Sequence, residues 1–167
     1  MHPRGLRLLP SYHDYHLYDT GVEPIMRLAR ERGMIVQIFT RIADERWHWM
    51  LNVPERPMHD LEYATAVFDQ QPIVVCGLNR PQSLAGRMTQ HPMLYADVSR
   101  LRGPVFGVEQ LAKSAPADRL LFGSLWPIQI IEATLWQVTS ARIDRAERDR
   151  ILRDNAATLL KEEQNPH

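Results

Sequence analysis

Cysteine, long apolar runs and net charge are all scarce or missing in this chain. It has one cysteine, Cys76, among 167 residues, which excludes an internal disulfide framework and every zinc motif built from several cysteines. No stretch approaches the roughly 20 apolar residues of a membrane span, and the first residues do not have the pattern of a signal peptide. We therefore expect a cytoplasmic protein that is not inserted in a membrane.

Charge of one sign is also absent, because 20 lysines and arginines balance 20 aspartates and glutamates and no long block carries one sign. Binding to nucleic acid or to a membrane surface depends on concentrated positive charge. We therefore expect neither of these partners. The composition, 44% hydrophobic and 24% charged, is that of an ordinary globular protein with a buried core.

Motifs for several common chemistries are missing as well. The chain has no phosphate-binding glycine loop, no serine-nucleophile motif and no repeat of fixed period. The one thiol, Cys76, lies in an apolar run with no residue beside it that would lower its pKa, so we expect it to be inert. Composition therefore excludes classes of protein without naming a reaction.

Short apolar runs alternate with longer segments of helical periodicity along the whole chain. Strands are predicted at residues 6–9, 34–39, 73–78, 93–98 and 120–123, and helices at 22–32, 61–68, 82–88, 108–114, 128–142 and 144–160. Parallel neighbours need crossover connections, and helices cover both faces of such a sheet. The pattern predicts an α/β fold with about five parallel strands in a single domain, residues 1–167.

Four strings carry a resemblance to a known family. They are G-L-R-L-L-P at 5–10, L-A-R-E-R-G-M-I-V-Q-I at 28–38, A-D-R-L-L-F-G-S at 117–124 and I-L-R-D-N-A-A-T-L-L at 151–160. In this order and spacing they resemble the C-terminal part of amidohydrolase-related (β/α)8 barrels, in the branch of aminocarboxymuconate-semialdehyde-type decarboxylases. The resemblance implies a partial TIM-like barrel that corresponds to the family's strands four to eight and its closing helix.

The same resemblance implies a divalent metal, usually zinc, bound by a strand-one H-x-H pair, later histidines and a strand-eight aspartate. This chain has Leu125 where the family has that aspartate and Phe39 where relatives have a strand-five histidine. Residues 75–78 offer no histidine either, and the H-x-H pair has no counterpart. Leucine and phenylalanine have no lone pair for a cation. We therefore predict no metal cofactor.

The predicted function follows from these substitutions. We expect an amidohydrolase-family protein that is inactive as a metal hydrolase on its own, a pseudoenzyme that binds a small molecule or a partner protein. The alternative is an active metal-dependent hydrolase or decarboxylase of a small carboxylated substrate. In that case the missing ligands would come from an upstream segment or a partner chain.

Ligand sites of α/β proteins lie beyond the carboxyl ends of the strands, so polar residues there are the candidates for substrate binding. The predicted substrate-binding residues are His13, His16, Arg41, Asn79, Asp97 and Arg100. Arg41 directly follows a strand, and a guanidinium can grip a carboxylate with two parallel hydrogen bonds. The long irregular stretch that begins with Arg41 also contains Asp44, Glu45 and His48. These residues either bind a carboxylate or shuttle a proton, or they form a solvated helical turn.

Two of these interpretations stay open. His13 and His16 either line a ligand pocket or are polar loop residues, and we predict no metal at them because no third ligand at metal spacing accompanies them. Asp97 either binds a ligand, pairs with Arg100 or forms a hydrogen bond in the interior.

Five strand-helix units also raise a physical problem. A closed barrel has no sheet edges, whereas a part of one leaves its first and last strands unpaired. We therefore expect a homo-oligomer, or a second chain that completes the barrel.

Overall fold

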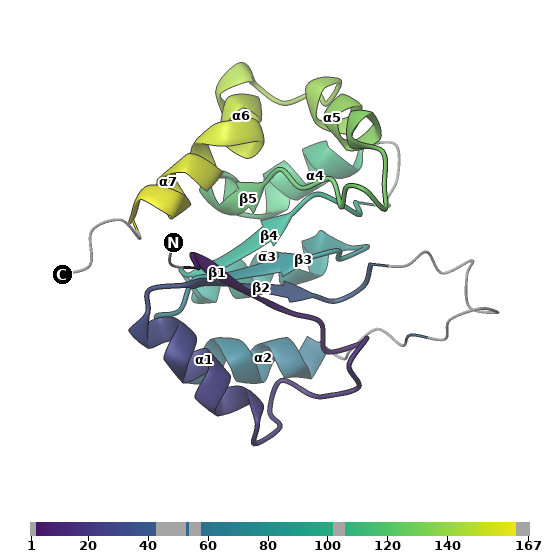
Figure 1. Ribbon diagram of the computed structural model, residues 1–167. Coiled ribbons are helices and arrows are strands. Elements are labelled where there is room, and N and C mark those ends of the chain that lie inside the picture. Colours follow the sequence, from purple (N-terminus) through teal and green to yellow (C-terminus); the bar gives the residue numbers. More distant parts are fainter. Residues whose placement is uncertain (1–2, 43–52, 54–57, 102–105, 163–167) are drawn as a thin grey trace.

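A computed structural model of the chain describes residues 3–42, 53, 58–101 and 106–162. These residues form one parallel sheet with helices packed around it (Figure 1). Its strands are β1 (Gly5–Leu8), β2 (Ile35–Phe39), β3 (Ile73–Cys76), β4 (Leu94–Asp97) and β5 (Leu120–Leu121). They pair in sequence order, and every neighbouring pair is parallel. The prediction of five parallel strands alternating with helices is confirmed.

The helices follow the strands at nearly the predicted positions. They are α1 (Val22–Glu31), α2 (Met58–Val67), α3 (Ala85–Gln90), α4 (Gly107–Ser114), α5 (Ile131–Thr139), α6 (Arg145–Asp149) and α7 (Asn155–Glu162). A short 3-10 turn, Pro81–Leu84, precedes α3, and a π-helical turn, Arg150–Asp154, joins α6 to α7. Helix α2 begins at Met58 rather than at the predicted residue 61, and Met58 packs against the large buried cluster one turn before Leu61. This difference places His59 and Asp60 in the first turn of a helix.

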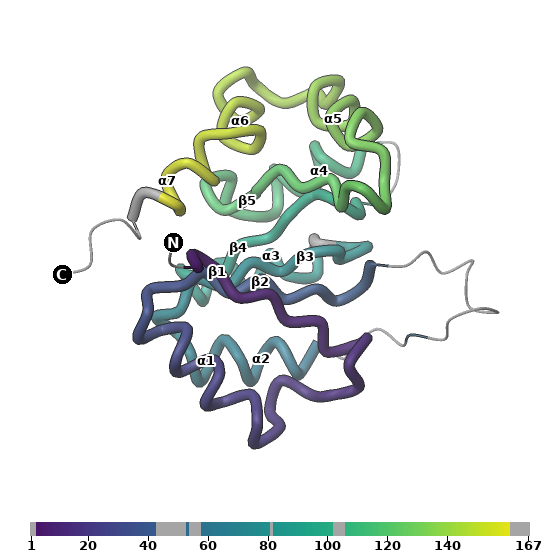
Figure 2. Tube along the Cα trace, in the orientation of Figure 1, coloured from purple at the N-terminus to yellow at the C-terminus, as the bar shows by residue number. Residues whose placement is uncertain are grey.

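The sheet has two faces that differ in what covers them. The outer face packs against the helices, and Val36 and Val75 share its large buried cluster with Met26 of α1 and Leu111 of α4. In the view of Figures 1 and 2, these outer-face helices surround the strands, with α1 and α2 below them and α4 above. The inner face has a smaller buried cluster, made of Ile35, Phe39, Val74, Cys76, Tyr95, Leu121 and Leu159. Side chains alternate between the two faces because successive residues of a strand point in opposite directions.

Helix α7 covers the amino-terminal end of the inner face. Its Leu159 is 3% exposed and belongs to the same cluster as Ile35, at the start of β2, and Tyr95, near the start of β4. The side chain of Asn155 in the same helix donates hydrogen bonds of 2.8 Å to the carbonyls of Ala117 and Leu120. The helix therefore fills one end of the inner face and leaves the carboxyl end of the strands open.

The edge strands of the sheet are β1 and β5, and each pairs with one other strand in the part of the chain that the structure describes. The turn after β5 gains a further contact, because the Phe122 amide donates to the Ile151 carbonyl at 2.8 Å. The expectation that a second copy or another chain covers these edges stays a prediction.

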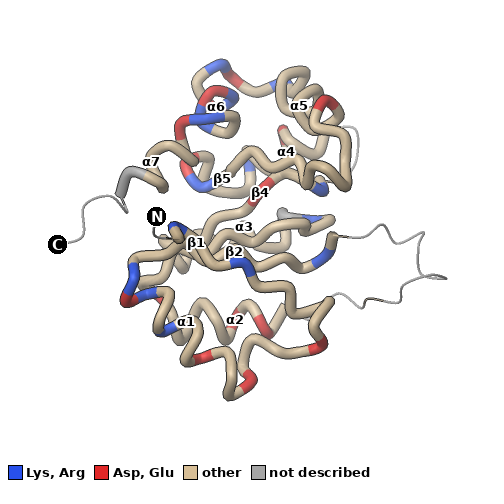
Figure 3. Tube along the Cα trace, viewed as in Figure 1, with Lys and Arg blue, Asp and Glu red and all other residues tan. Residues whose placement is uncertain are grey.

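Charges on the described surface are mixed. Helix α1 carries Glu23 and Glu31 beside Arg27 and Arg30, and α6 likewise alternates acidic and basic residues (Figure 3). Among the helices described here, none is both long enough and apolar enough to cross a membrane.

Candidate functional site

A pocket of about 340 Å³ lies on the inner face at the carboxyl ends of the strands. Each strand contributes to its lining, and the segment after β5 forms one wall. The lining residues used below are Arg7, Gln37, Phe39, Val74, Cys76, Asp97, Leu121, Ser124 and Leu125. Because the helices cover the outer face and α7 covers the amino end, this pocket is where the inner face of the sheet stays accessible.

Arg7 is the cation of this pocket. Arg7 of β1 and Gln37 of β2 are cross-strand partners, and the arginine Nε donates to Gln37 Oε1 at 3.2 Å. Its guanidinium carbon lies 4.9 Å from the centre of the Phe39 ring, which is a cation-π contact. Among the described residues, no carboxylate forms an ion pair with Arg7, although Asp97 lines the same pocket.

Asp97, the last residue of β4, is held by the neighbouring backbone. Its Oδ1 accepts hydrogen bonds from the Ser99 hydroxyl at 2.8 Å, the Gly77 amide at 3.2 Å and the Ser99 amide at 3.4 Å. On the other side, a Cβ added to Gly123 would lie 2.5 Å from Oδ2. The carboxyl group thus forms the interior hydrogen bonds that the sequence allowed. No ion pair joins it to Arg100 among the described residues.

Burial governs the protonation of Asp97. Desolvation raises the pKa of this carboxyl, and the hydrogen bonds from Ser99 and Gly77 offset only part of the effect. Burial also raises the pKa of the Cys76 thiol well above its ordinary value, and the negative charge of Asp97 acts in the same direction. The thiol is therefore held in its protonated, unreactive form, which agrees with the inert role expected for it.

Replacing Asp97 with asparagine should change how stability depends on pH. An aspartate whose pKa is raised in the folded state favours folding most below about pH 4, its ordinary pKa, and this contribution is lost as the pH rises through the raised value. The unfolding free energy of the wild type minus that of Asp97→Asn should therefore fall from pH 4 towards neutrality. Urea denaturation of both proteins across this range measures the difference, and a constant value would contradict the burial effect.

The pocket lining does not fit the metal that the family resemblance implies. Of the residues that line it, only Cys76 and Asp97 have side chains of the type that binds zinc, and the thiol is held protonated. Even a catalytic zinc normally has three protein ligands. Phe39 and Leu125, at the two positions where the resemblance places ligands, pack against the inner-face cluster instead.

Leu125 has an unusual backbone for its residue type. Its φ of 53° lies in the left-handed region, which branched apolar residues rarely adopt and which asparagine and aspartate adopt much more readily. The backbone at this position therefore suits an aspartate better than the leucine that occupies it. This conformation agrees with the interpretation of Leu125 as a substituted ligand position.

The other predicted site residues lie outside this pocket lining. Arg41 is buried, and its Nη2 donates to the Val53 carbonyl at 3.3 Å. His13 is exposed beside Tyr15, Asn79 is half-buried and Arg100 is 2% exposed. The substrate-binding roles of these four stay predictions, and Asp44, Glu45 and His48 lie outside the described residues.

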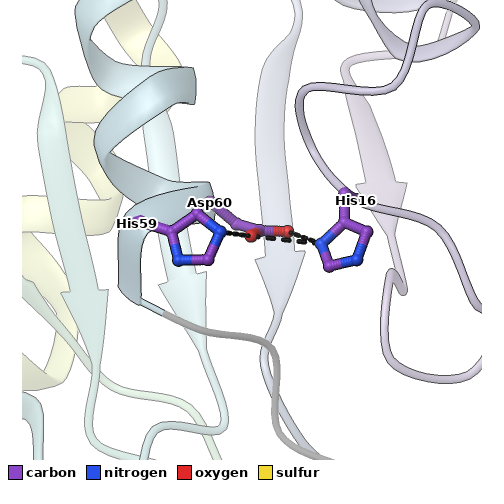
Figure 4. Close-up of side chains that lie close together, drawn as sticks. All are labelled: His16, His59 and Asp60. Atoms are coloured by element: carbon purple, nitrogen blue, oxygen red, sulfur yellow. Dashed lines mark hydrogen bonds and ion pairs between the residues drawn. The ribbon is translucent and has the colours of Figure 1, made fainter.

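His16 lies in a different cluster, on the side of the sheet that carries α1 and α2. Its Nδ1 is 3.0 Å from Oδ2 of Asp60, and His59 Nε2 is 3.2 Å from Oδ1 of the same carboxylate (Figure 4). One ligand atom from each of the three residues lies within 4.8 Å of the others. The sequence shows no third ligand at metal spacing beside His13 and His16, but the fold brings two residues to His16 from more than 40 positions along the chain, so the prediction of no metal is not confirmed.

Both clusters contain residues that the sequence reasoning missed. Arg7 and Gln37 are polar residues within apolar strand strings, and this interruption is the signal that marks them as facing a pocket. The adjacent pair His59-Asp60 stands just before a predicted helix, but nothing in the sequence pairs it with His16. Only the strand register and the helix position bring these groups together.

Comparison with known proteins gives one family and several similar folds. A family model described as Amidohydrolase matches residues 1–161. No curated protein matches the chain. An uncharacterized TIM-barrel protein from Bordetella bronchiseptica is similar with a TM-score of 0.77 and 20% identity, over 97% of this chain and 58% of that one.

Two decarboxylases are also similar in structure. The 5-carboxyvanillate decarboxylase of Sphingomonas paucimobilis has a TM-score of 0.67 and 12% identity, over 95% of this chain and 58% of that one. The 2,6-dihydroxybenzoate decarboxylase from Rhizobium has a TM-score of 0.65 and 19% identity, over 88% of this chain and 57% of that one. These identities carry the fold alone, and they confirm the partial TIM-like barrel. The chain spans less than two thirds of each of these proteins.

Proposed function

Because this chain belongs to the amidohydrolase family, with a match over residues 1–161, we propose that it binds a small planar carboxylate in the inner-face pocket without a metal there. The guanidinium of Arg7 in the pocket, held over the Phe39 ring and by Gln37, is the observation that carries this proposal. A cation fixed on both sides is oriented before the ligand arrives. Less conformational entropy is therefore lost on binding.

The rest of the pocket matches a flat apolar body with one charged group. Phe39, Val74, Leu121 and Leu125 provide apolar wall opposite the polar groups. A ring between such side chains is removed from water, while its carboxylate pairs with Arg7. Asp97 Oδ1 accepts hydrogen bonds from Gly77 and Ser99, so these protein donors partly stabilise its charge beside the ligand.

The names of the similar decarboxylases support this class of ligand. 5-Carboxyvanillate and 2,6-dihydroxybenzoate are both benzene rings that carry a carboxylate. Those proteins share the fold at 12% and 19% identity, so their reaction is not transferred with it. What this chain contributes from its own residues is a cation, an apolar wall and a buried acid on one face of the sheet.

Replacing Arg7 with glutamine should weaken binding of 2,6-dihydroxybenzoate by about 10- to 100-fold, since a hydrogen bond to a charged group contributes roughly 1.5–3 kcal/mol. Isothermal titration calorimetry on the purified protein measures this change. The uncharged amide of the same ring is the ligand control and should bind the wild type no better than the acid binds Arg7→Gln. Arg30→Gln on the exposed surface of α1 is the protein control and should leave the affinity unchanged.

Two outcomes would contradict the proposal. If the wild type and Arg7→Gln bind the acid with equal affinity, Arg7 does not bind the carboxylate. If the wild type binds the acid and the amide with equal affinity, the charge of the ligand does not contribute to binding. A third outcome is that the protein turns the acid over, loses this activity when a chelator is added and keeps it in Cys76→Ser. This outcome would favour the alternative of an active metal-dependent enzyme. Ligands for that metal would then come from outside the described pocket lining.

A further inference from the structure

We propose that His16, His59 and Asp60 form a binding site for one divalent transition metal ion, with zinc as the best match. The site is separate from the inner-face pocket, since none of the three residues lines that pocket. His16 belongs to the loop after β1, and the other two residues begin α2, so the site lies beyond the carboxyl ends of the first two strands. Two imidazoles and a carboxylate are ligand types that zinc accepts, and two histidines with one carboxylate is a known catalytic set.

The distances between the ligand atoms suit zinc without a large rearrangement. Asp60 lies between the two histidines, with an oxygen 3.0 Å from His16 Nδ1 and another 3.2 Å from His59 Nε2 (Figure 4). In a tetrahedral site with metal bonds of roughly 2.0–2.2 Å, neighbouring ligand atoms are about 3.4 Å apart. Small changes of side-chain torsion would therefore open the space that an ion needs.

Neighbouring groups already orient the three ligands. The Leu17 amide donates to Oδ2 of Asp60 at 3.2 Å, and this carboxylate is 1% exposed. The ring of Tyr18 stacks on both imidazoles, at 4.7 Å from His16 and 5.9 Å from His59. Hydrogen bonds that hold a ligating carboxylate in place raise the affinity of metal sites, and the stacked ring restricts how the two imidazoles can turn.

The exposure of the ligands says how an ion would enter. The side chain of His16 is 33% exposed and that of His59 is 57% exposed, while Asp60 forms the buried base of the site. An ion held by these three residues would face solvent and keep a position for water. Three protein ligands with an open fourth position differ from a closed structural site, so we expect exchangeable rather than permanent binding.

Titration of metal-free, untagged protein with Zn²⁺, followed by calorimetry, tests this site. The wild type should bind one ion, and His59→Ala should bind it at least tenfold more weakly. Asp60→Asn keeps the shape of the buried carboxylate but not its charge, and should have the same effect. His91→Ala, a half-exposed histidine at the end of α3, should bind as the wild type does.

A purely structural role for the cluster predicts a different result. If Asp60 serves only to join the loop to α2, zinc will bind the wild type no better than it binds His59→Ala, and the proposal is overturned. Binding that survives His59→Ala and is lost in Cys76→Ser would place the ion in the inner-face pocket and would also overturn it. Thermal unfolding with and without Zn²⁺ gives a second readout, because an ion bound only to the folded state raises the midpoint in the wild type and not in His59→Ala.

Discussion

Replacing Gly77 with alanine should destabilise the protein by about 3–5 kcal/mol, at the upper end of single substitutions. Gly77 has a φ of +72°, and a Cβ added to it would lie 2.1 Å from the Arg41 carbonyl oxygen. The left-handed backbone alone costs a residue with a side chain about 1–2 kcal/mol. The clash adds to this cost, because the neighbouring group is backbone and the two strand ends have to separate.

The same substitution should disturb the candidate site. The Gly77 amide donates to Oδ1 of Asp97, so a shift of this turn moves the carboxyl that lines the pocket. Urea denaturation measures the loss of stability, and the affinity for 2,6-dihydroxybenzoate measures the effect on the pocket.

Gly86→Ala is the matched control for this prediction. Gly86 lies in α3, and an added Cβ meets no atom within 4 Å. Alanine should therefore stabilise the protein by about 0.5–1 kcal/mol through its higher helix propensity. A loss below 1 kcal/mol in Gly77→Ala would show that the strand ends move apart more easily than close-packed backbone should.

Replacing Asn155 with alanine should destabilise the protein by about 2–4 kcal/mol, because unsatisfied buried groups cost roughly 1–3 kcal/mol each. Asn155 is 6% exposed, and its amide nitrogen donates at 2.8 Å to the carbonyls of Ala117 and Leu120. Alanine leaves both acceptors without this donor. The start of α7 would also lose its attachment beside β5, and with it the contact that places Leu159 against the inner face.

Asp154→Ala is the control at the neighbouring position. Asp154 forms an ion pair with Arg153 at 2.9 Å, but both side chains are exposed, so its loss should change stability by less than about 0.5–1 kcal/mol. Chemical denaturation of the two variants in parallel gives the comparison. Equal stability of Asn155→Ala and Asp154→Ala would mean that the two hydrogen bonds do not attach the helix.

Two of the four strings that resemble the amidohydrolase family contain residues with a structural role. Asn155 lies in I-L-R-D-N-A-A-T-L-L, and its role in the fold is to join the closing helix to the backbone around β5. The string A-D-R-L-L-F-G-S includes β5 and Gly123, which leaves room for Asp97. These contacts stabilise the architecture and do not depend on a metal.

Local sequence patterns explain why the strands and most helices could be predicted correctly. Apolar runs and helical periodicity are properties of neighbouring residues, so they located all five strands and placed the helices close to their observed bounds. The start of α2 differs, because Met58 is separated from Leu61 by the polar pair His59 and Asp60, which a pattern of neighbouring apolar residues does not include. The predicted helix therefore omits the first turn, which contains His59 and Asp60 of the proposed metal site.

Sequence by itself determined the strand-helix order, the family and the apolar side chains at Phe39 and Leu125, because these depend on residue types at given positions. The tertiary structure decided which distant groups meet. Strand register set Arg7 beside Gln37 and over Phe39, and the docking of α2 against the loop after β1 set Asp60 between His16 and His59. No local pattern encodes these contacts, since the residues of each are separated by about 30 to 44 positions and are joined only when the sheet and its helices pack.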